Sequence, residues 1–181
     1  MKRVFVLAAA GLCLALAGAP AFATGIAPGV YGGLSYPILQ DDVSSGTIYG
    51  VRATVSIVPM LSGEVFYASS DMGDAEETLG GIAYTRDGYD AKAYGVNVML
   101  GSPTGMGFRF FPLAGIGKYK LERAVDEEID EVGYNIGLGV GIGATPKLSL
   151  QIRGELNLVK TGDTSRKFGN VTAGLSYSLL P

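Results

Sequence analysis

Apolar and polar residues alternate with a period of two along most of the chain. In LSLQIRGELNLV, residues 148–159, five large aliphatic side chains fall on one face and five polar side chains on the other. In GYNIGLGVGIG, residues 133–143, Tyr134 and four aliphatic residues alternate with Asn135 and glycines. Strict alternation over such lengths predicts β-strands with one apolar face.

Eight segments show this pattern, and no segment has the periodicity of an amphipathic helix. The predicted strands span residues 29–38, 47–57, 62–70, 91–100, 108–121, 132–143, 148–158 and 170–179. Short turns follow the second, fourth and sixth strands, whereas the other connections are long and charged. Of the seventeen acidic residues, all but Glu64 and Glu155 lie in the long connections at 39–46, 71–90, 122–131 and 159–169.

The direction of the apolar face decides between a soluble barrel and a membrane barrel. The polar face consists mainly of Gly, Ser, Thr and Asn, small residues that suit a crowded interior better than a water-facing surface. Short turns at one end and long loops at the other are typical of outer-membrane barrels. Six tyrosines are expected on the apolar face at the long-loop end, as an aromatic girdle at headgroup level. They are Tyr36, Tyr49, Tyr67, Tyr94, Tyr119 and Tyr134.

The whole stretch from Thr24 to Pro181, typified by GYNIGLGVGIGATPKLSLQIRGELNL, resembles the small outer-membrane β-barrel proteins. The resemblance implies an all-β, eight-stranded, antiparallel up-and-down transmembrane β-barrel with both termini in the periplasm. In this family the last strand usually finishes with an aromatic residue. Here Tyr177 is followed by Ser-Leu-Leu-Pro, which departs from that pattern.

The N-terminus has the features of a cleaved secretory signal peptide. Lys2 and Arg3 precede an apolar run, and Ala21-Phe22-Ala23 is a small-residue cleavage site. We therefore expect a signal peptide at residues 1–23 and one barrel domain at residues 24–181, located in the outer membrane. Loss of the two basic residues takes the formal net charge from −3 to −5, which argues against a nucleic-acid partner.

Charged residues on the interior face must be paired, because an unpaired buried charge is very costly. Arg52, Glu64, Arg153 and Glu155 are expected to point into the lumen. The interior of an eight-stranded barrel is narrow, and its inward-facing side chains fill it. We therefore predict that the two acids and two arginines form one hydrogen-bonded network. Its possible satellites are Asn97, Asn135, Gln151 and Asn157.

The sequence offers little for catalysis. It contains no histidine, so mechanisms that use a histidine base are not available to it. The glycine run at 137–143 does not have the spacing of a dinucleotide-binding loop followed by a helix. The acidic stretch 126–131 lacks the spacing of a calcium loop. No catalytic residue, cofactor or metal site is expected.

These observations predict a non-enzymatic outer-membrane protein with a structural or surface-interaction role, in contact with outer-membrane lipids. Its acidic loops are candidates for binding an unidentified extracellular ligand. Two alternatives remain at this stage: a narrow pore or carrier for small or apolar solutes, and a secreted or periplasmic soluble barrel.

Overall fold

The computed structural model describes residues 25–38, 44–58, 60–73, 75–79, 82–86, 89–123, 128–161 and 164–179. The predicted signal peptide lies outside these residues. No helix in the described part of the chain is long and apolar enough to cross a membrane.

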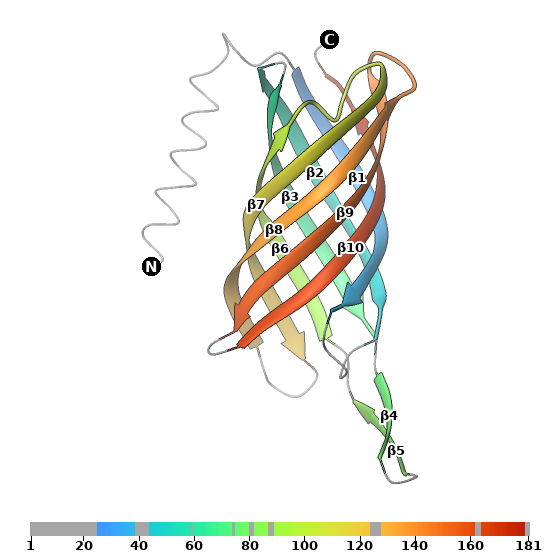
Figure 1. The fold of residues 1–181 in the computed structure, drawn as a ribbon, viewed down its shortest axis with the longest axis vertical. Helices are drawn as coiled ribbons and strands as arrows, with labels where there is room; N and C mark the ends of the chain where they lie inside the picture. The colour runs from blue at the N-terminus through green and yellow to red at the C-terminus, as the bar shows by residue number, and fades with distance from the viewer. Residues whose placement is uncertain are drawn as a thin grey trace.

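Eight antiparallel strands close into a barrel (Figure 1). Neighbours along the chain pair with one another, and β1 pairs with β10 to close the sheet, for example through Val30 and Leu175. The predicted eight-stranded up-and-down barrel is therefore confirmed. The barrel strands are β1 (Gly25–Pro37), β2 (Gly46–Val58), β3 (Leu61–Met72), β6 (Tyr89–Leu100), β7 (Gly107–Arg123), β8 (Glu128–Gly143), β9 (Leu148–Thr161) and β10 (Thr164–Tyr177).

The connection at 71–90 is not a plain loop, which corrects the expectation from the sequence. It contains a separate hairpin of β4 (Ala75–Leu79) and β5 (Ile82–Arg86), which extends away from the end of the barrel (Figure 1). Leu79 pairs with Ile82 at the tip of the described part of the hairpin. The five-residue strands are too short to give a clear alternation, so the sequence pattern does not predict them.

The apolar face of the barrel points outward. Leu138, Leu150 and Val30 are exposed on the outer surface, whereas Ser149 and Gln151 are buried inside. A continuous outer surface of Leu, Ile, Val and Tyr is what a hydrocarbon environment requires. The direction inferred from the small polar residues is therefore confirmed.

The glycines of β8 face the crowded lumen and leave room for larger side chains from the neighbouring strand and turn. A Cβ atom at Gly139 would overlap the ring of Phe111 on β7, and one at Gly141 would overlap the carbonyl oxygen of Pro103. The alternation of glycine with aliphatic residues thus reflects close packing on one face and contact with lipid on the other.

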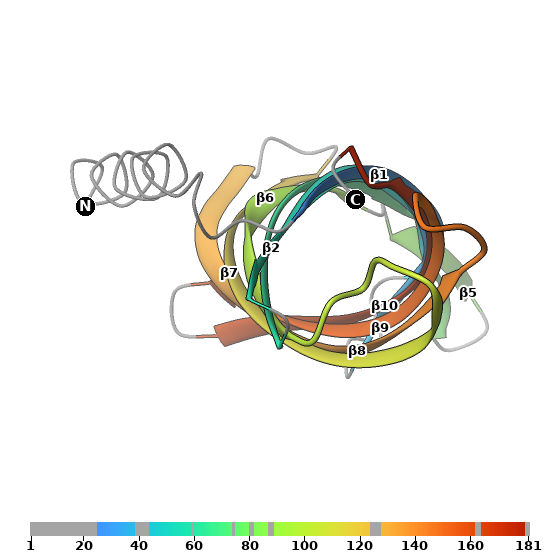
Figure 2. The same ribbon diagram turned by 90° about the horizontal axis from the view of Figure 1, so that it is seen from above.

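The chain between β6 and β7 folds across the short-turn end of the barrel. Figure 2, which looks down the barrel, shows this segment crossing the opening. Pro103 is fully buried there. The Ser62 hydroxyl donates to the Gly101 carbonyl at 2.9 Å, and the Gly105 amide donates to the Ser149 hydroxyl at 3.3 Å. The connection therefore acts as a cap that is tied to the barrel wall.

The outward placement of Leu150 predicts a depth-dependent cost for charge. Leu150→Arg or Leu138→Arg should lower the free energy of unfolding by about 2–4 kcal/mol, because a charged group would lie at mid-membrane depth. Equilibrium unfolding by urea in phospholipid vesicles measures this cost. Ala144→Arg, in the exposed turn before β9, is the matched control and should change little. An unchanged stability for Leu150→Arg would show that this face does not contact lipid.

Candidate functional site

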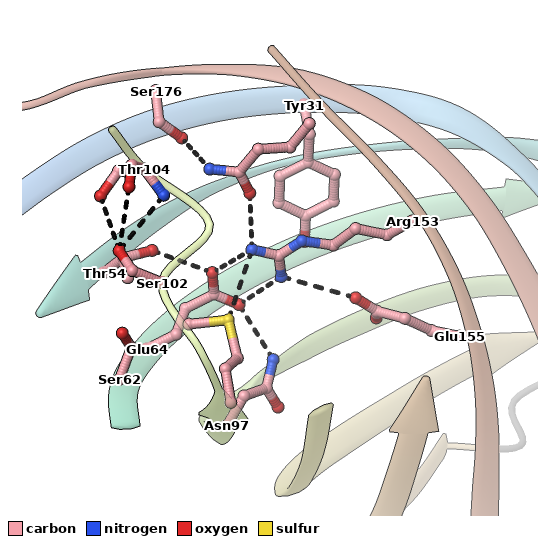
Figure 3. Close-up of polar contacts among 12 residues, drawn as sticks. Tyr31, Thr54, Ser62, Glu64, Asn97, Ser102, Thr104, Arg153, Glu155 and Ser176 are labelled. Carbon is pink, nitrogen blue, oxygen red and sulfur yellow. Dashed lines mark hydrogen bonds and ion pairs between the residues drawn. The ribbon is translucent and has the colours of Figure 1, made fainter. Parts of the chain in front are cut away.

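The centre of the lumen is occupied by an ion pair between Glu64 on β3 and Arg153 on β9 (Figure 3). Arg153 donates from Nη1 to Oε1 of Glu64 and from Nη2 to Oε2, each at 2.7 Å. Both side chains are 1% exposed. A two-pronged contact of this kind fixes the orientation of both groups. In the barrel order the two strands are four apart in either direction, so the pair spans the full width of the lumen.

Polar side chains from β9 itself and from other strands also form hydrogen bonds with the pair. Glu64 also accepts hydrogen bonds from the Thr54 hydroxyl at 3.2 Å and the Asn97 amide at 3.0 Å. The Asn135 amide donates in turn to Asn97 at 3.0 Å. Arg153 donates from Nη2 to Gln151 at 2.7 Å. Three of the predicted satellites, Asn97, Asn135 and Gln151, therefore lie in the same set of hydrogen bonds as the ion pair.

The other two predicted charges are bound less closely. Glu155 lies 3.7 Å from Nη1 of Arg153 and keeps 17% of its side chain exposed. Arg52 is buried, and its guanidinium lies 4.7 Å from the centre of the Tyr31 ring. Its Nε and Nη2 have no hydrogen-bond partner among the described residues. The hydrogen bonds expected from Arg52 to the network are not seen at these two atoms, and its guanidinium stacks on an aromatic ring.

Tyr119 is inside the barrel and not in the girdle, which corrects the sequence assignment. It is 1% exposed, and its hydroxyl donates to Asn157 at 2.8 Å. Its ring meets Phe168 edge-on, with centroids 5.9 Å apart. The error comes from the start of β7, where Phe108 and Phe110 lie on one face and Phe111 on the other, so that the inward and outward positions of the strand could not be told apart. Asn157, the fourth predicted satellite, belongs to this contact and not to the ion pair.

The other five predicted girdle residues project from the outer face. They are Tyr36, Tyr49, Tyr67, Tyr94 and Tyr134, all exposed. Tyr67 and Tyr94 are direct partners across β3 and β6. Five amphipathic rings near one end of the barrel match the belt expected at headgroup level.

Sequence reasoning missed the aromatic residues that fill the lumen. The guanidinium of Arg153 lies 5.1 Å from the centre of the Phe111 ring, just as the guanidinium of Arg52 lies against the ring of Tyr31. On the long-loop side, Tyr119 and Phe168 pack with the inward-facing residues Ile48 and Val159. Counting alternate positions from Asn170 would place Phe168 inside, and counting from Ser35 would place Tyr31 inside.

The filled lumen restricts what this region can do chemically. The cavity beside Arg52, Glu64 and Glu155 has a volume of about 20 Å³, room for about one water molecule. The described residues contain no group of three side chains suited to bind a metal ion. The buried groups are thus arranged to hold one another and leave little space for a substrate.

The geometry makes Glu64 and Glu155 unequal in their effect on stability. Glu64→Ala should cost about 3–5 kcal/mol of unfolding free energy, because it leaves Arg153 buried without its two-pronged partner. Glu155→Ala, the control, should cost clearly less, because that carboxylate is farther from Arg153 and partly exposed. Urea unfolding of both variants in vesicles measures the difference. A cost for Glu155→Ala equal to or above that of Glu64→Ala would contradict this order.

Comparisons with known proteins agree with the fold. The sequence model of the outer membrane protein beta-barrel domain matches residues 9–178. A search of curated protein sequences finds no match to the chain. Three similar solved structures are Neisserial surface protein A (NspA), the N-terminal β-barrel domain of Pseudomonas aeruginosa OprF, and Yersinia pestis Ail in complex with the heparin analogue sucrose octasulfate.

The three structures have low sequence identity to this chain but similar extent. NspA is 13% identical to this chain with a TM-score of 0.62, and the aligned region covers 85% of this chain and 96% of NspA. The OprF domain is 12% identical with a TM-score of 0.56, and the aligned region covers 87% of this chain and 98% of the domain. Ail is 15% identical with a TM-score of 0.51, and the aligned region covers 86% of this chain and 99% of Ail. At such identities the structures show the fold alone. The sequence model, which spans most of the chain, shows the family: this protein belongs to the outer-membrane β-barrel proteins.

Proposed function

We propose that this protein is a non-enzymatic surface protein in which a closed barrel holds long loops that bind a partner outside the cell. The single observation that carries the proposal is the filled lumen. The Glu64–Arg153 pair crosses its centre, aromatic and aliphatic side chains occupy the long-loop side, and the segment at 101–106 covers the other end. A barrel whose cavity beside the central ion pair has room for about one water molecule is suited to support and not to passage.

The side chains described in the lumen offer little for catalysis, which also supports this role. Histidine is missing from the sequence. The buried acid Glu64 is bound on both oxygens, since Arg153, Thr54 and Asn97 donate to it. A carboxylate held in this way is poorly placed to act as a general base, which needs access to the proton that it removes.

The long loops are the part of the molecule most able to recognise a partner. Nearly all acidic residues of the chain lie in them. Acidic loops favour a neutral or cationic partner and disfavour a polyanion, because like charges repel at close range. In this respect the ligand of these loops is proposed to differ from the sulfated compound in the Ail structure.

A narrow pore is the second candidate, and one feature of the lumen favours it. Two nitrogen atoms of Arg52 have no hydrogen-bond partner among the described residues, and Glu155 contacts Arg153 only at 3.7 Å. A rearrangement of these charges would open a path through the polar layer.

Planar bilayer recording separates the two candidates. The purified full-length mature protein should show no steady current, because the central pair and the cap at 101–106 block the lumen. Arg153→Ala is the matched variant, since it removes the central pair while leaving the cap intact. Reproducible ion current through the wild type, altered in size by Arg153→Ala, would overturn the closed-barrel proposal and favour transport.

A further inference from the structure

The cap at 101–106 is bounded on both sides by glycines in the left-handed region. Gly101 and Gly105 have φ angles of 100° and 113°, and Gly107, which begins β7, has a φ of 84°. Glycine moves between such angles and ordinary ones at low steric cost, because it has no Cβ atom. Small residues at the ends of an element are common hinges, since they absorb large changes in φ and ψ. The cap can therefore turn about both of its ends.

The tip of the cap is held together by hydrogen bonds within the cap itself. The Ser102 hydroxyl lies 3.1 Å from the carbonyl oxygen and 3.2 Å from the hydroxyl of Thr104, and it accepts from the Thr104 amide at 3.4 Å (Figure 3). Pro103 stands between the two residues, with a φ angle that its ring restricts. These contacts stay intact when the tip moves, so residues 102–104 behave as one rigid unit.

Neutral hydrogen bonds hold the cap to the barrel wall. In addition to the bonds with Ser62 and Ser149, the hydroxyls of Ser56 and Ser102 lie 3.3 Å apart. The cap sequence GSPTGM has no charged residue, so it offers no side chain for an ion pair. A neutral hydrogen bond that water can replace contributes little net stability. The cap is therefore held loosely in comparison with the groups of the central ion pair.

The wall beneath the cap has a shape that fits it. A Cβ atom at Gly141 would overlap the carbonyl oxygen of Pro103, and one at Gly143 would overlap the carbonyl oxygen of Gly105. Pro103 is fully buried in this seat. The seated position is thus the resting state of the cap, and the glycines of β8 keep space for it.

The two ends of the lumen differ in what their opening would expose to water. On the long-loop side the buried residues Ile48, Val159 and Phe168 are apolar, and wetting them is unfavourable. Several inward-facing residues around the cap carry hydroxyl groups instead, and a hydroxyl that loses one partner can bond to water. They are Thr54, Ser56, Ser62, Ser149 and Ser176. The short-turn end is therefore the end that opens at the lower cost.

From these features we propose that the cap is a hinged plug, which leaves its seat as one unit and admits water to the lumen from the short-turn side. The water reaches Ser176 and Gln151, which are joined by a hydrogen bond of 2.8 Å, and Gln151 accepts from Arg153 at 2.7 Å. The plug thus controls the hydration of the central ion pair. The pair and the apolar residues beyond it still close the barrel, so the inference does not depend on what the loops bind.

The test uses the reactivity of a single introduced thiol. Residues 24–181 contain no cysteine, and Ser176→Cys places one at a position that is 1% exposed, beside Ser149 of the seat. The folded mature protein, in lipid nanodiscs that leave both faces open to solvent, is treated with iodoacetamide, and intact mass gives the labelling rate. Ser176→Cys should react, whereas Val159→Cys, buried among apolar residues on the long-loop side, should stay unlabelled.

A change in the seat tests whether the cap controls this access. Ser62→Ala removes the donor to the Gly101 carbonyl from the far side of the barrel, and it should raise the labelling rate of Ser176→Cys by about fivefold, the effect of one neutral hydrogen bond. Ser178→Ala is the matched control, because this serine at the same end has no hydrogen bond from its side chain to the cap among the described residues. It should leave the labelling rate unchanged.

Three outcomes would overturn the proposal: labelling of Ser176→Cys no faster than that of Val159→Cys, equal acceleration by Ser62→Ala and Ser178→Ala, or an equal rise in the labelling of Val159→Cys when Ser62→Ala is present. The last result would show that the whole barrel loosens and not the cap alone. Heat-dependent electrophoretic mobility checks that each variant is folded. If Ser176→Cys does not fold, Ala27→Cys takes its place, because Ala27 is 3% exposed and lies on β1 near the same end.

Discussion

The Glu64–Arg153 ion pair is the interaction on which the interior of this barrel depends. It joins strands on opposite sides of the lumen through two hydrogen bonds of 2.7 Å. Two charges buried in so narrow a space are tolerated only when they satisfy each other and their remaining hydrogen-bonding groups are also engaged. Thr54, Asn97 and Gln151 provide those additional contacts. The polar layer is therefore determined by the need to accommodate this one pair.

The rest of the interior follows from the limited width of an eight-stranded barrel. Aromatic rings from β1, β7 and β10 take up much of the space, and glycines appear on β8 where those rings and the cap at 101–106 approach the wall. The outer surface obeys a separate requirement, because it must be apolar at mid-membrane depth and amphipathic at the rims. The exposed tyrosines lie on this outer surface near the long-loop rim. The residues that suit the lipid-facing wall, the lumen and the rim thus differ along the same strands, because their surroundings differ.

Much of this architecture could be predicted from the sequence because alternation is a local property. The outward positions of Leu150 and Leu138 follow from parity alone, as do the inward positions of Glu64 and Arg153. Parity failed at Tyr119, since the apolar run before it gives no indication of which face is inside. Lys118 and Lys120 face outward on the same strand, and Lys118 lies directly across from the girdle residue Tyr94. Which acid pairs with which arginine across the lumen could not be predicted either. Whether Arg52 meets a carboxylate or the ring of Tyr31 depends on side-chain directions that no sequence spacing fixes.

The most direct test of this view is a double-mutant cycle on Glu64→Gln and Arg153→Met, with unfolding free energies measured in phospholipid vesicles. Two groups that form a buried two-pronged pair should show a coupling energy of about 2–3 kcal/mol. Such a value would establish that the contact across the lumen holds the two sides of the barrel together. Costs that add to within about 0.5 kcal/mol would show that the two side chains act independently, and would contradict the central role assigned to the pair.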